Sequence, residues 1–243
     1  QPMIARLIPF STIKGWLFDL DGTLMDTVDQ TVEVLAQRLR FLGQARAHRT
    51  ARRLVMVSES PLNTALTLTD IVGLDTLVFS LRRRLSRGVE PTFSLINGVK
   101  PLLAHLSGRG RLAVVSTRPA LDATRFLEQH NLEDLFDLCV TQETTRRLKP
   151  HPQPVAYAAQ ALGISPSECV MIGDTPADMR SGRRAGAWTI GVLCGFGEQK
   201  ELWATGADQV VSSTADILPL VTSEVDQQGS CSGVGEVTMG ERW

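Results

Sequence analysis

Two aspartates stand two residues apart in the stretch Trp-Leu-Phe-Asp-Leu-Asp-Gly-Thr-Leu-Met-Asp, which runs from Trp16 to Asp26. Its apolar, aromatic start is typical of a buried strand in a parallel sheet. Side chains two residues apart in a strand face the same way, so Asp19 and Asp21 can converge on one small volume. Charged groups at the end of a buried strand are costly unless paired, and a metal ion is a suitable partner. Taken alone, the same residues are equally compatible with an ordinary turn.

A second apolar run, Val-Met-Ile-Gly-Asp-Thr-Pro-Ala-Asp-Met from Val170 to Met179, also ends in a carboxylate. Gly173 would let the backbone come close to another group, and Asp178 lies one helical turn beyond Asp174. This stretch therefore repeats the design of the first one. For Asp178, an ordinary acid in the first turn of a helix is about as good an interpretation as a functional role.

Two further polar features are expected where a strand passes into a helix. Ser116 and Thr117 precede Arg118 and Pro119, and such hydroxyls commonly cap the following helix. The same position also suits a phosphate oxygen, because the helix N-terminus presents free N–H groups. Lys149 stands in Lys-Pro-His-Pro before another expected helix, and by itself it would be an ordinary surface lysine.

The segments that must position these residues alternate between short apolar runs and helical patterns from Gly98 onward. Such alternation predicts right-handed βαβ units and a parallel sheet with helices on both faces, an α/β fold. The expected strands after the first are 111–116, 138–141, 169–173, 188–192 and 209–212, and the expected helices are 99–106, 119–130, 152–162 and 176–185.

Residues from about 26 to 92 carry helical spacing without a strand signal of their own, which indicates an α-helical insertion after the first strand. Its irregular basic section includes Arg52 and Arg53, for which a solvated face is favoured over contact with a substrate anion. Residues from about Thr222 onward are polar and rich in glycine, so we expect a disordered tail.

Composition narrows the classes of function. The 243 residues carry a net charge of −1, which gives no electrostatic reason to expect nucleic acid as a partner. No apolar run is long enough to span a membrane, and the first residues do not resemble a signal peptide. The four cysteines form no Cys-x-x-Cys pair, so we expect no structural zinc and a reduced, cytoplasmic protein.

The order of these motifs along the chain resembles that of the haloacid dehalogenase-like phosphohydrolases. Asp-x-Asp-Gly-Thr, Ser-Thr, Lys-Pro and Gly-Asp-Thr-x-x-Asp follow one another, and the resemblance covers roughly residues 14–220. It implies a three-layer Rossmann-like core, at 1–25 and 93–221, with a helical cap at 26–92 and a tail at 222–243. The cap position, together with residues 147–197, is similar to the phosphoglycolate phosphatase-like branch.

The resemblance also implies catalytic roles. Asp19 would be the nucleophile that forms an aspartyl-phosphate, and Asp21 the general acid and base. Mg²⁺ would be held by Asp19, Asp174 and the main-chain carbonyl of Asp21. Lys149 would add positive charge near the phosphate.

Further residues would support these groups. Asp178 would orient Lys149 or a metal-bound water, with Thr175 beside it. The phosphate would be bound by Lys149 and by four residues of the first two motifs, namely Gly22, Thr23, Ser116 and Thr117. Candidate substrate contacts are Arg52, Arg53 and Arg118; many relatives have Asn or Lys in place of Arg118.

The expected activity is that of a Mg²⁺-dependent phosphatase acting on a small phosphorylated metabolite, with 2-phosphoglycolate or a sugar phosphate as the leading class. A phosphomutase similar to beta-phosphoglucomutase shares all four motifs and remains the nearest alternative. A non-catalytic binding protein of the same fold is disfavoured by the intact acidic residues, and dehalogenation by Asp21 and Asp174. We expect no nucleic-acid or membrane partner, and a monomer or homodimer.

Overall fold

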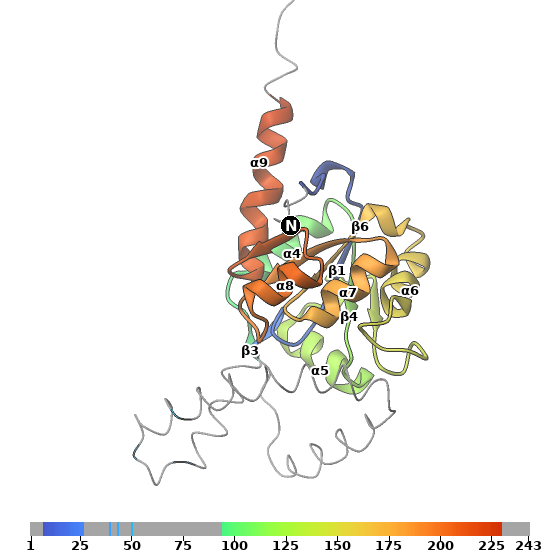
Figure 1. The fold of residues 1–243 in the computed structure, drawn as a ribbon, viewed down its shortest axis with the longest axis vertical. Coiled ribbons are helices and arrows are strands. Elements are labelled where there is room, and N and C mark those ends of the chain that lie inside the picture. Colours follow the sequence, from blue (N-terminus) through green and yellow to red (C-terminus); the bar gives the residue numbers. More distant parts are fainter. Residues whose placement is uncertain (1–6, 27–38, 40–42, 44–49, 51–93, 230–243) are drawn as a thin grey trace, which may run out of the picture.

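The computed structural model describes residues 7–26, 39, 43, 50 and 94–229 of the chain, and the side chains among these up to residue 223. Its centre is a six-stranded sheet in the order β5-β4-β1-β6-β7-β8, and every neighbouring pair is parallel (Figure 1). This confirms the predicted α/β class. The strands are β1 (Gly15–Phe18), β4 (Arg111–Val115), β5 (Leu138–Val140), β6 (Cys169–Gly173), β7 (Trp188–Val192) and β8 (Gln209–Val211).

Strand β1 lies at the middle of this sheet, between β4 and β6. All four of its residues are buried, as expected for a strand covered on both faces. Its last residue, Phe18, is in register with Val114 on one side and Ile172 on the other. Asp19 therefore leaves the sheet beside the ends of both neighbouring strands.

Helices cover both faces of the sheet, which gives three layers (Figure 1). Trp16 and Phe18 face a cluster that includes residues of α4 (Val99–Ser107), α5 (Ala120–His130) and α9 (Ile217–Gly229). Leu17 points to the opposite face and packs in a second cluster with α6 (Gln153–Ala161). The alternation of side chains along β1 thus supplies both halves of the core. Helices α7 (Pro176–Ala185) and α8 (Gln199–Thr205) complete the second face.

The helical insertion expected at 26–92 lies outside the described residues, apart from Asp26, Leu39, Gly43 and Thr50. Two short strands mark its ends, β2 (Met25–Asp26) and β3 (Ser94–Leu95), and they pair in antiparallel fashion. The sequence pattern did not predict this pair, because two residues are too few to show a period. The pairing places Asp26 opposite Ser94, so the chain leaves β2 and returns to β3 at the same point.

Two other elements differ from the sequence prediction. Helix α8 was not predicted, and it has seven residues of which only Leu202 is buried, so it shows no helical period. Residues 222–229 were assigned to the disordered tail, but α9 continues through them to Gly229. Ile217 and Val221 are buried and fix the start of α9, and extending a helix is easier than starting one. Residues 230–243 of the expected tail lie outside the described part.

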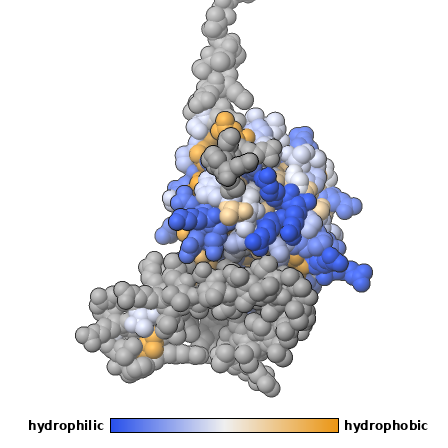
Figure 2. All heavy atoms as spheres, in the orientation of Figure 1, coloured by the Kyte–Doolittle hydropathy of each residue, from blue (hydrophilic) through white to orange (hydrophobic). Residues whose placement is uncertain are grey.

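Hydrophilic side chains cover much of the face that carries α7 and α8 (Figure 2). Among the residues described here, no helix is both long and apolar enough to cross a membrane.

Candidate active site

Lys149 lies at the carboxyl edge of the sheet, just before α6, and is almost completely buried. Its Nζ donates hydrogen bonds to Asp19 Oδ1 at 2.7 Å, to Asp178 Oδ1 at 2.6 Å and to the carbonyl of Val115 at 2.8 Å. Three acceptors match the three N–H groups of an ammonium. The lysine that the sequence alone would have left on the surface therefore joins the end of β4 to the segments that follow β1 and β6.

Asp178 is fully buried, and both of its carboxylate oxygens are engaged. Oδ1 accepts from Lys149, and Oδ2 accepts from the backbone N–H of Thr175 at 3.0 Å and from its hydroxyl at 2.6 Å. The two residues form a capping box at the N-terminus of α7. Asp178 thus combines the helix-capping role and the lysine contact that the sequence left open.

Asp174 is also fully buried, but only one of its oxygens has a partner. Oδ2 accepts from the backbone N–H of Phe196 at 2.8 Å, whereas Oδ1 has no hydrogen-bond partner in the described structure. A buried carboxylate oxygen without a partner is costly. The unpartnered Oδ1 of Asp174 is therefore the feature of this site that favours binding of a further ligand.

Three glycines make room for Asp174. A Cβ atom would lie 2.3 Å from Asp174 Oδ2 if placed at Gly22, and 2.0 Å from the same atom at Gly195. At Gly197 it would lie 1.8 Å from the backbone oxygen of Asp174. The loop from Leu193 to Gly197 was not expected at this site, although it follows β7 at the same edge of the sheet and its two glycines are visible in the sequence.

A divalent cation fits this arrangement. Ligand oxygens of Asp19, Asp174 and Asp178 lie within 4.8 Å of one another. The three carboxylates outnumber the single ammonium of Lys149, so the cluster has an excess of negative charge when all are ionised. Since Asp178 is already satisfied by Lys149 and Thr175, Asp19 and the unpartnered oxygen of Asp174 are the better donors. Hard carboxylate oxygens are what Mg²⁺ prefers.

The pKa values reflect the same excess of buried negative charge. Burial raises the pKa of Asp19 to about 7, the charges of Asp178 and Asp21 act in the same direction, and Lys149 opposes them. The pKa of Asp174 is raised well above its ordinary value, first by burial and then by Asp178 and Asp19. Burial acts to lower the pKa of Lys149, but the charges of Asp178 and Asp19 outweigh it and raise that pKa. A bound cation would reverse the rise at both carboxyls.

Asp21 is held by a residue 97 positions away in the chain. Arg118 donates from Nε to Asp21 Oδ2 and from Nη2 to Asp21 Oδ1, each at 2.6 Å. This is the two-pronged geometry that a guanidinium forms with a carboxylate. Arg118 was expected among the substrate contacts, whereas in the structure it pairs with the residue expected to act as general acid and base.

The expected phosphate-binding residues take different positions. Ser116 is buried after β4, and its hydroxyl accepts from the backbone N–H of Arg118 at 3.1 Å; Thr117 beside it is half-buried. Thr23 is fully buried and its hydroxyl has no partner among the described residues. The N–H of Gly22 already donates to the carbonyl of Met25 at 2.8 Å, so Gly22 contributes through its close packing on Asp174. Arg52 and Arg53 lie outside the described residues.

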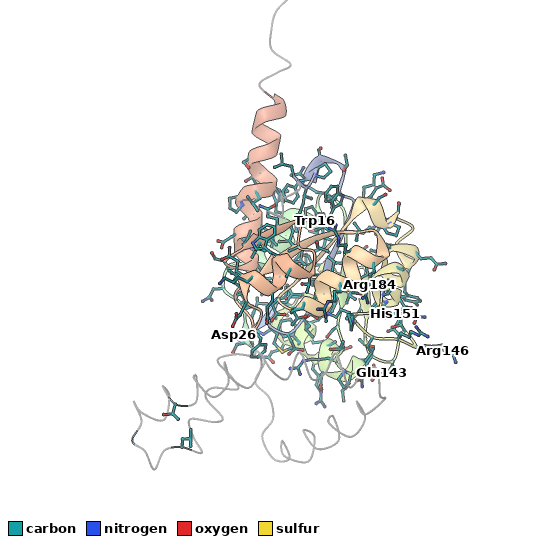
Figure 3. All side chains as sticks on the ribbon, in the orientation of Figure 1. Trp16, Asp26, Glu143, Arg146, His151 and Arg184 are labelled. Carbon is teal, nitrogen blue, oxygen red and sulfur yellow. The ribbon has the colours of Figure 1, made fainter. Side chains whose placement is uncertain are left out.

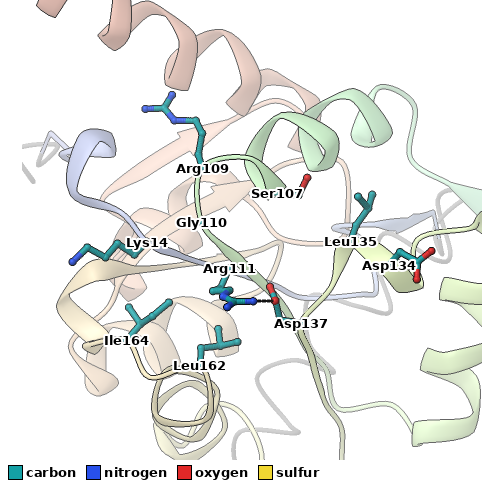
Figure 4. Close-up of a pocket in the computed structure, with 10 residues that line it drawn as sticks. All are labelled: Lys14, Ser107, Arg109, Gly110, Arg111, Asp134, Leu135, Asp137, Leu162 and Ile164. Carbon is teal, nitrogen blue, oxygen red and sulfur yellow. Dashed lines mark hydrogen bonds and ion pairs between the residues drawn. The ribbon is translucent and has the colours of Figure 1, made fainter.

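The acidic cluster is distinct from a pocket of about 500 Å³ at the amino end of the strands (Figure 4). Lys14, just before β1, and Arg111, at the start of β4, line that pocket, and Arg111 pairs with Asp137. Figure 3 shows Trp16, near the start of β1, and Asp26, beyond its end, at opposite ends of the core. The pocket lies at the start of the strands, whereas the carboxylates lie at their carboxyl ends. The pocket is therefore not where the carboxylates meet.

Comparison with known proteins identifies the family. Residues 16–192 match the family model described as haloacid dehalogenase-like hydrolase. The chain is 28% identical over 218 residues to a phosphoglycolate phosphatase of Pectobacterium atrosepticum, covering 87% of this chain and 93% of that protein. It is 29% identical over 215 residues to the pyrophosphatase PpaX of Bacillus pumilus, covering 88% and 99%. A predicted phosphatase from Clostridium acetobutylicum has the same fold, with a TM-score of 0.64, 24% identity and coverage of 88% and 99%.

Proposed function

The chain belongs to the haloacid dehalogenase-like hydrolases, and we propose that it is a Mg²⁺-dependent phosphatase acting on a small phosphorylated metabolite through an aspartyl-phosphate. The observation that carries the proposal is the position of Asp19. It is buried at the end of the central strand, its Oδ1 is fixed by Lys149, and a second acid, Asp21, follows two residues later. Relatives named phosphoglycolate phosphatase and pyrophosphatase support the same reaction class.

In the first half-reaction, Asp19 Oδ2 attacks phosphorus, and the bond between phosphorus and the leaving oxygen breaks. The hydrogen bond from Lys149 to Oδ1 orients the carboxylate for this attack. Protonated Asp21 gives its proton to the leaving oxygen. In the second half-reaction Asp21 takes a proton from water, whose oxygen displaces Asp19 from phosphorus and releases phosphate.

Asp19 and Asp174 would hold the cation. When bound, Mg²⁺ supplies positive charge that offsets the phosphate dianion and favours the ionised form of Asp19. Asp178 acts through Lys149, because it accepts a hydrogen bond from the same ammonium that donates to Asp19. Ser116 and Thr117 would donate hydroxyl hydrogen bonds to the phosphoryl oxygens.

The test is phosphate release from a panel of 2-phosphoglycolate, pyrophosphate and sugar phosphates, with Mg²⁺ or with EDTA. We expect release to require Mg²⁺ and to fall by about 10⁴-fold or more in Asp19→Asn, as when a nucleophile is removed. The matched control is Asp134→Asn, an exposed aspartate far along the chain, which should retain wild-type activity. Release that survives in Asp19→Asn would contradict the assigned nucleophile.

The panel also tests the mutase alternative. A phosphomutase would convert a sugar phosphate to its isomer with little release of inorganic phosphate. A phosphatase releases phosphate from each productive substrate in proportion to its consumption. Isomer formation in excess of phosphate release would overturn the hydrolase assignment.

A further inference from the structure

Asp21 has no unengaged carboxylate oxygen in this structure, because Arg118 donates to both at 2.6 Å. A general acid must place one of its oxygens, with the proton, against the leaving oxygen of the substrate. Each oxygen keeps a second lone pair, but the two-pronged pair fixes the plane of the carboxylate, so turning one oxygen towards the substrate opens at least one of the two hydrogen bonds. The pair as observed is a resting arrangement of the acid.

The backbone of Arg118 is fixed while its side chain makes this contact. Its N–H donates to Ser116 Oγ at 3.1 Å, and its carbonyl accepts from the N–H of Gln142 at 3.1 Å. Glu143, which lies near α5 in Figure 3, accepts from the backbone N–H of Ala120 at 3.0 Å and so holds the start of that helix. Release of Asp21 is therefore a movement of side chains on a fixed loop.

The guanidinium lies between two acids. Asp21 is on one side, and Asp122 on α5 lies 3.9 Å from Nη1 on the other. Both Arg118 and Asp21 are partly exposed, with 27% and 30% of the side chain accessible, so a substrate can reach the pair. When Asp21 leaves, Arg118 gives up its two-pronged pair, and an anion of similar shape can take the place of Asp21 in that geometry.

A substrate can supply that anion through its leaving group. A carboxylate or phosphate on the leaving group offers two oxygens to the guanidinium. A neutral hydroxyl or amide does not replace the charged, two-pronged pair with Asp21. We propose that Arg118 recognises negative charge on the leaving group and releases Asp21 in exchange. The preferred substrates are then phosphate esters or anhydrides whose leaving group is itself an anion. This inference rests on the proposed function and narrows its substrate class.

The test compares matched substrates that differ in one charge. The first pair is 2-phosphoglycolate and its neutral amide, and the second is 2-phosphoglycerate and glycerol 2-phosphate. We expect the wild-type kcat/KM to favour the anionic member of each pair by about 10- to 100-fold, the range for a hydrogen bond to a charged group. In Arg118→Gln this ratio should fall towards one. Turnover of the neutral member should rise, because Asp21 is no longer held.

The control is Arg125→Gln, which removes an exposed arginine from α5, the helix that follows Arg118, and should keep the wild-type ratio. Equal losses on both members of a pair in Arg118→Gln would overturn the inference, since they would assign a purely structural role. A wild-type ratio near one would overturn it as well. Failure of the proposed function is a separate result: no Mg²⁺-dependent release from any substrate, p-nitrophenyl phosphate included, would remove both proposals.

Discussion

At the scale of single residues, Lys149 stabilises two buried carboxylates at once. Its side chain is 4% exposed, those of Asp19 and Asp178 are 9% and 0% exposed, and both contacts are hydrogen-bonded ion pairs. A buried charge that loses its partner is far more costly than an exposed one. The lysine is therefore important to stability as well as to the proposed chemistry.

Replacing Lys149 with methionine should destabilise the protein by about 3–5 kcal/mol at pH 8, because two ionised carboxylates are left buried without their partner. The matched control is Lys14→Met. Lys14 pairs with Glu168 at the surface with 65% of its side chain exposed, and such pairs contribute about 0–1 kcal/mol. Urea unfolding of both variants measures the difference. Similar costs for the two substitutions would contradict the buried ion pairs.

The residue contacts also show which part of the site the sequence could predict. Asp19, Asp21, Lys149 and Asp174 each stand at the end of an expected strand or the start of an expected helix, so their common edge followed from the topology. The ion pair between Asp21 and Arg118 could not be predicted in this way. It depends on the side-chain directions of two loops, and no local pattern in either loop records the other.

At the scale of elements, the loop after β7 closes over Asp174. Gly195 and Gly197 leave space for the carboxylate and its backbone, and the intervening Phe196 donates its N–H to Asp174 Oδ2. Because that bond engages one oxygen, the other is left for the proposed cation. The loop would thus orient the proposed metal ligand without supplying one itself.

Gly197→Ala should move this loop, because the added methyl group would lie 1.8 Å from the backbone oxygen of Asp174. We expect a loss of about 1–3 kcal/mol in stability from overpacking. We also expect Mg²⁺ affinity to weaken by about 10- to 100-fold, as for other changes behind a metal ligand. Calorimetric Mg²⁺ titration and urea unfolding measure the two effects.

The control for this loop is Gly108→Ala at the end of α4, where the added methyl group would meet its nearest atom at an ordinary 3.6 Å. This variant should bind Mg²⁺ as the wild type does. Unchanged Mg²⁺ affinity in Gly197→Ala would show that the loop does not orient Asp174.

Elements with a buried face of several residues were predicted from the sequence, whereas most of the short elements without one were not. Strands β1, β4, β6 and β7 and helices α4 to α7 have such faces. Strands β5 and β8 have one buried residue and none, and were predicted from short apolar runs alone. The observed bounds of these elements lie within one residue of the expected ones. Helix α8 and the β2–β3 pair have too few buried residues to produce a period. Their formation depends on contacts with the rest of the fold.

At the scale of the whole molecule, buried negative charge couples stability to pH and to metal. An unfolded aspartate titrates at a pKa of about 4, whereas burial raises the pKa of folded Asp19 to about 7. The folded state therefore holds a proton that the unfolded state has lost between these values. Stability contributed by protonated Asp19 is complete below about pH 4 and is lost as pH rises to about 7.

The metal-free protein should accordingly melt at a lower temperature as pH rises from 5 to 8, and Mg²⁺ should raise the melting temperature more at pH 8 than at pH 5. Asp19→Asn removes the titrating group, so its metal-free melting temperature should depend less on pH. Thermal melting with EDTA or Mg²⁺ at both pH values checks this, with Asp134→Asn as the control. An equal effect of Mg²⁺ at both pH values would contradict the expectation.

The position of β1 in the middle of the sheet has a consequence for how the protein is made. During synthesis this strand leaves the ribosome first, but its neighbours β4 and β6 begin at Arg111 and Cys169. Asp19 then acquires its partner Lys149, and Lys149 its second partner Asp178, only after residues 149 and 178 have been translated. Closing such long loops is slow, so the apolar residues of β1 stay exposed until β4 and β6 pair with it. The nascent chain is most vulnerable to aggregation before residue 178 emerges, and this interval is when a chaperone would help it most.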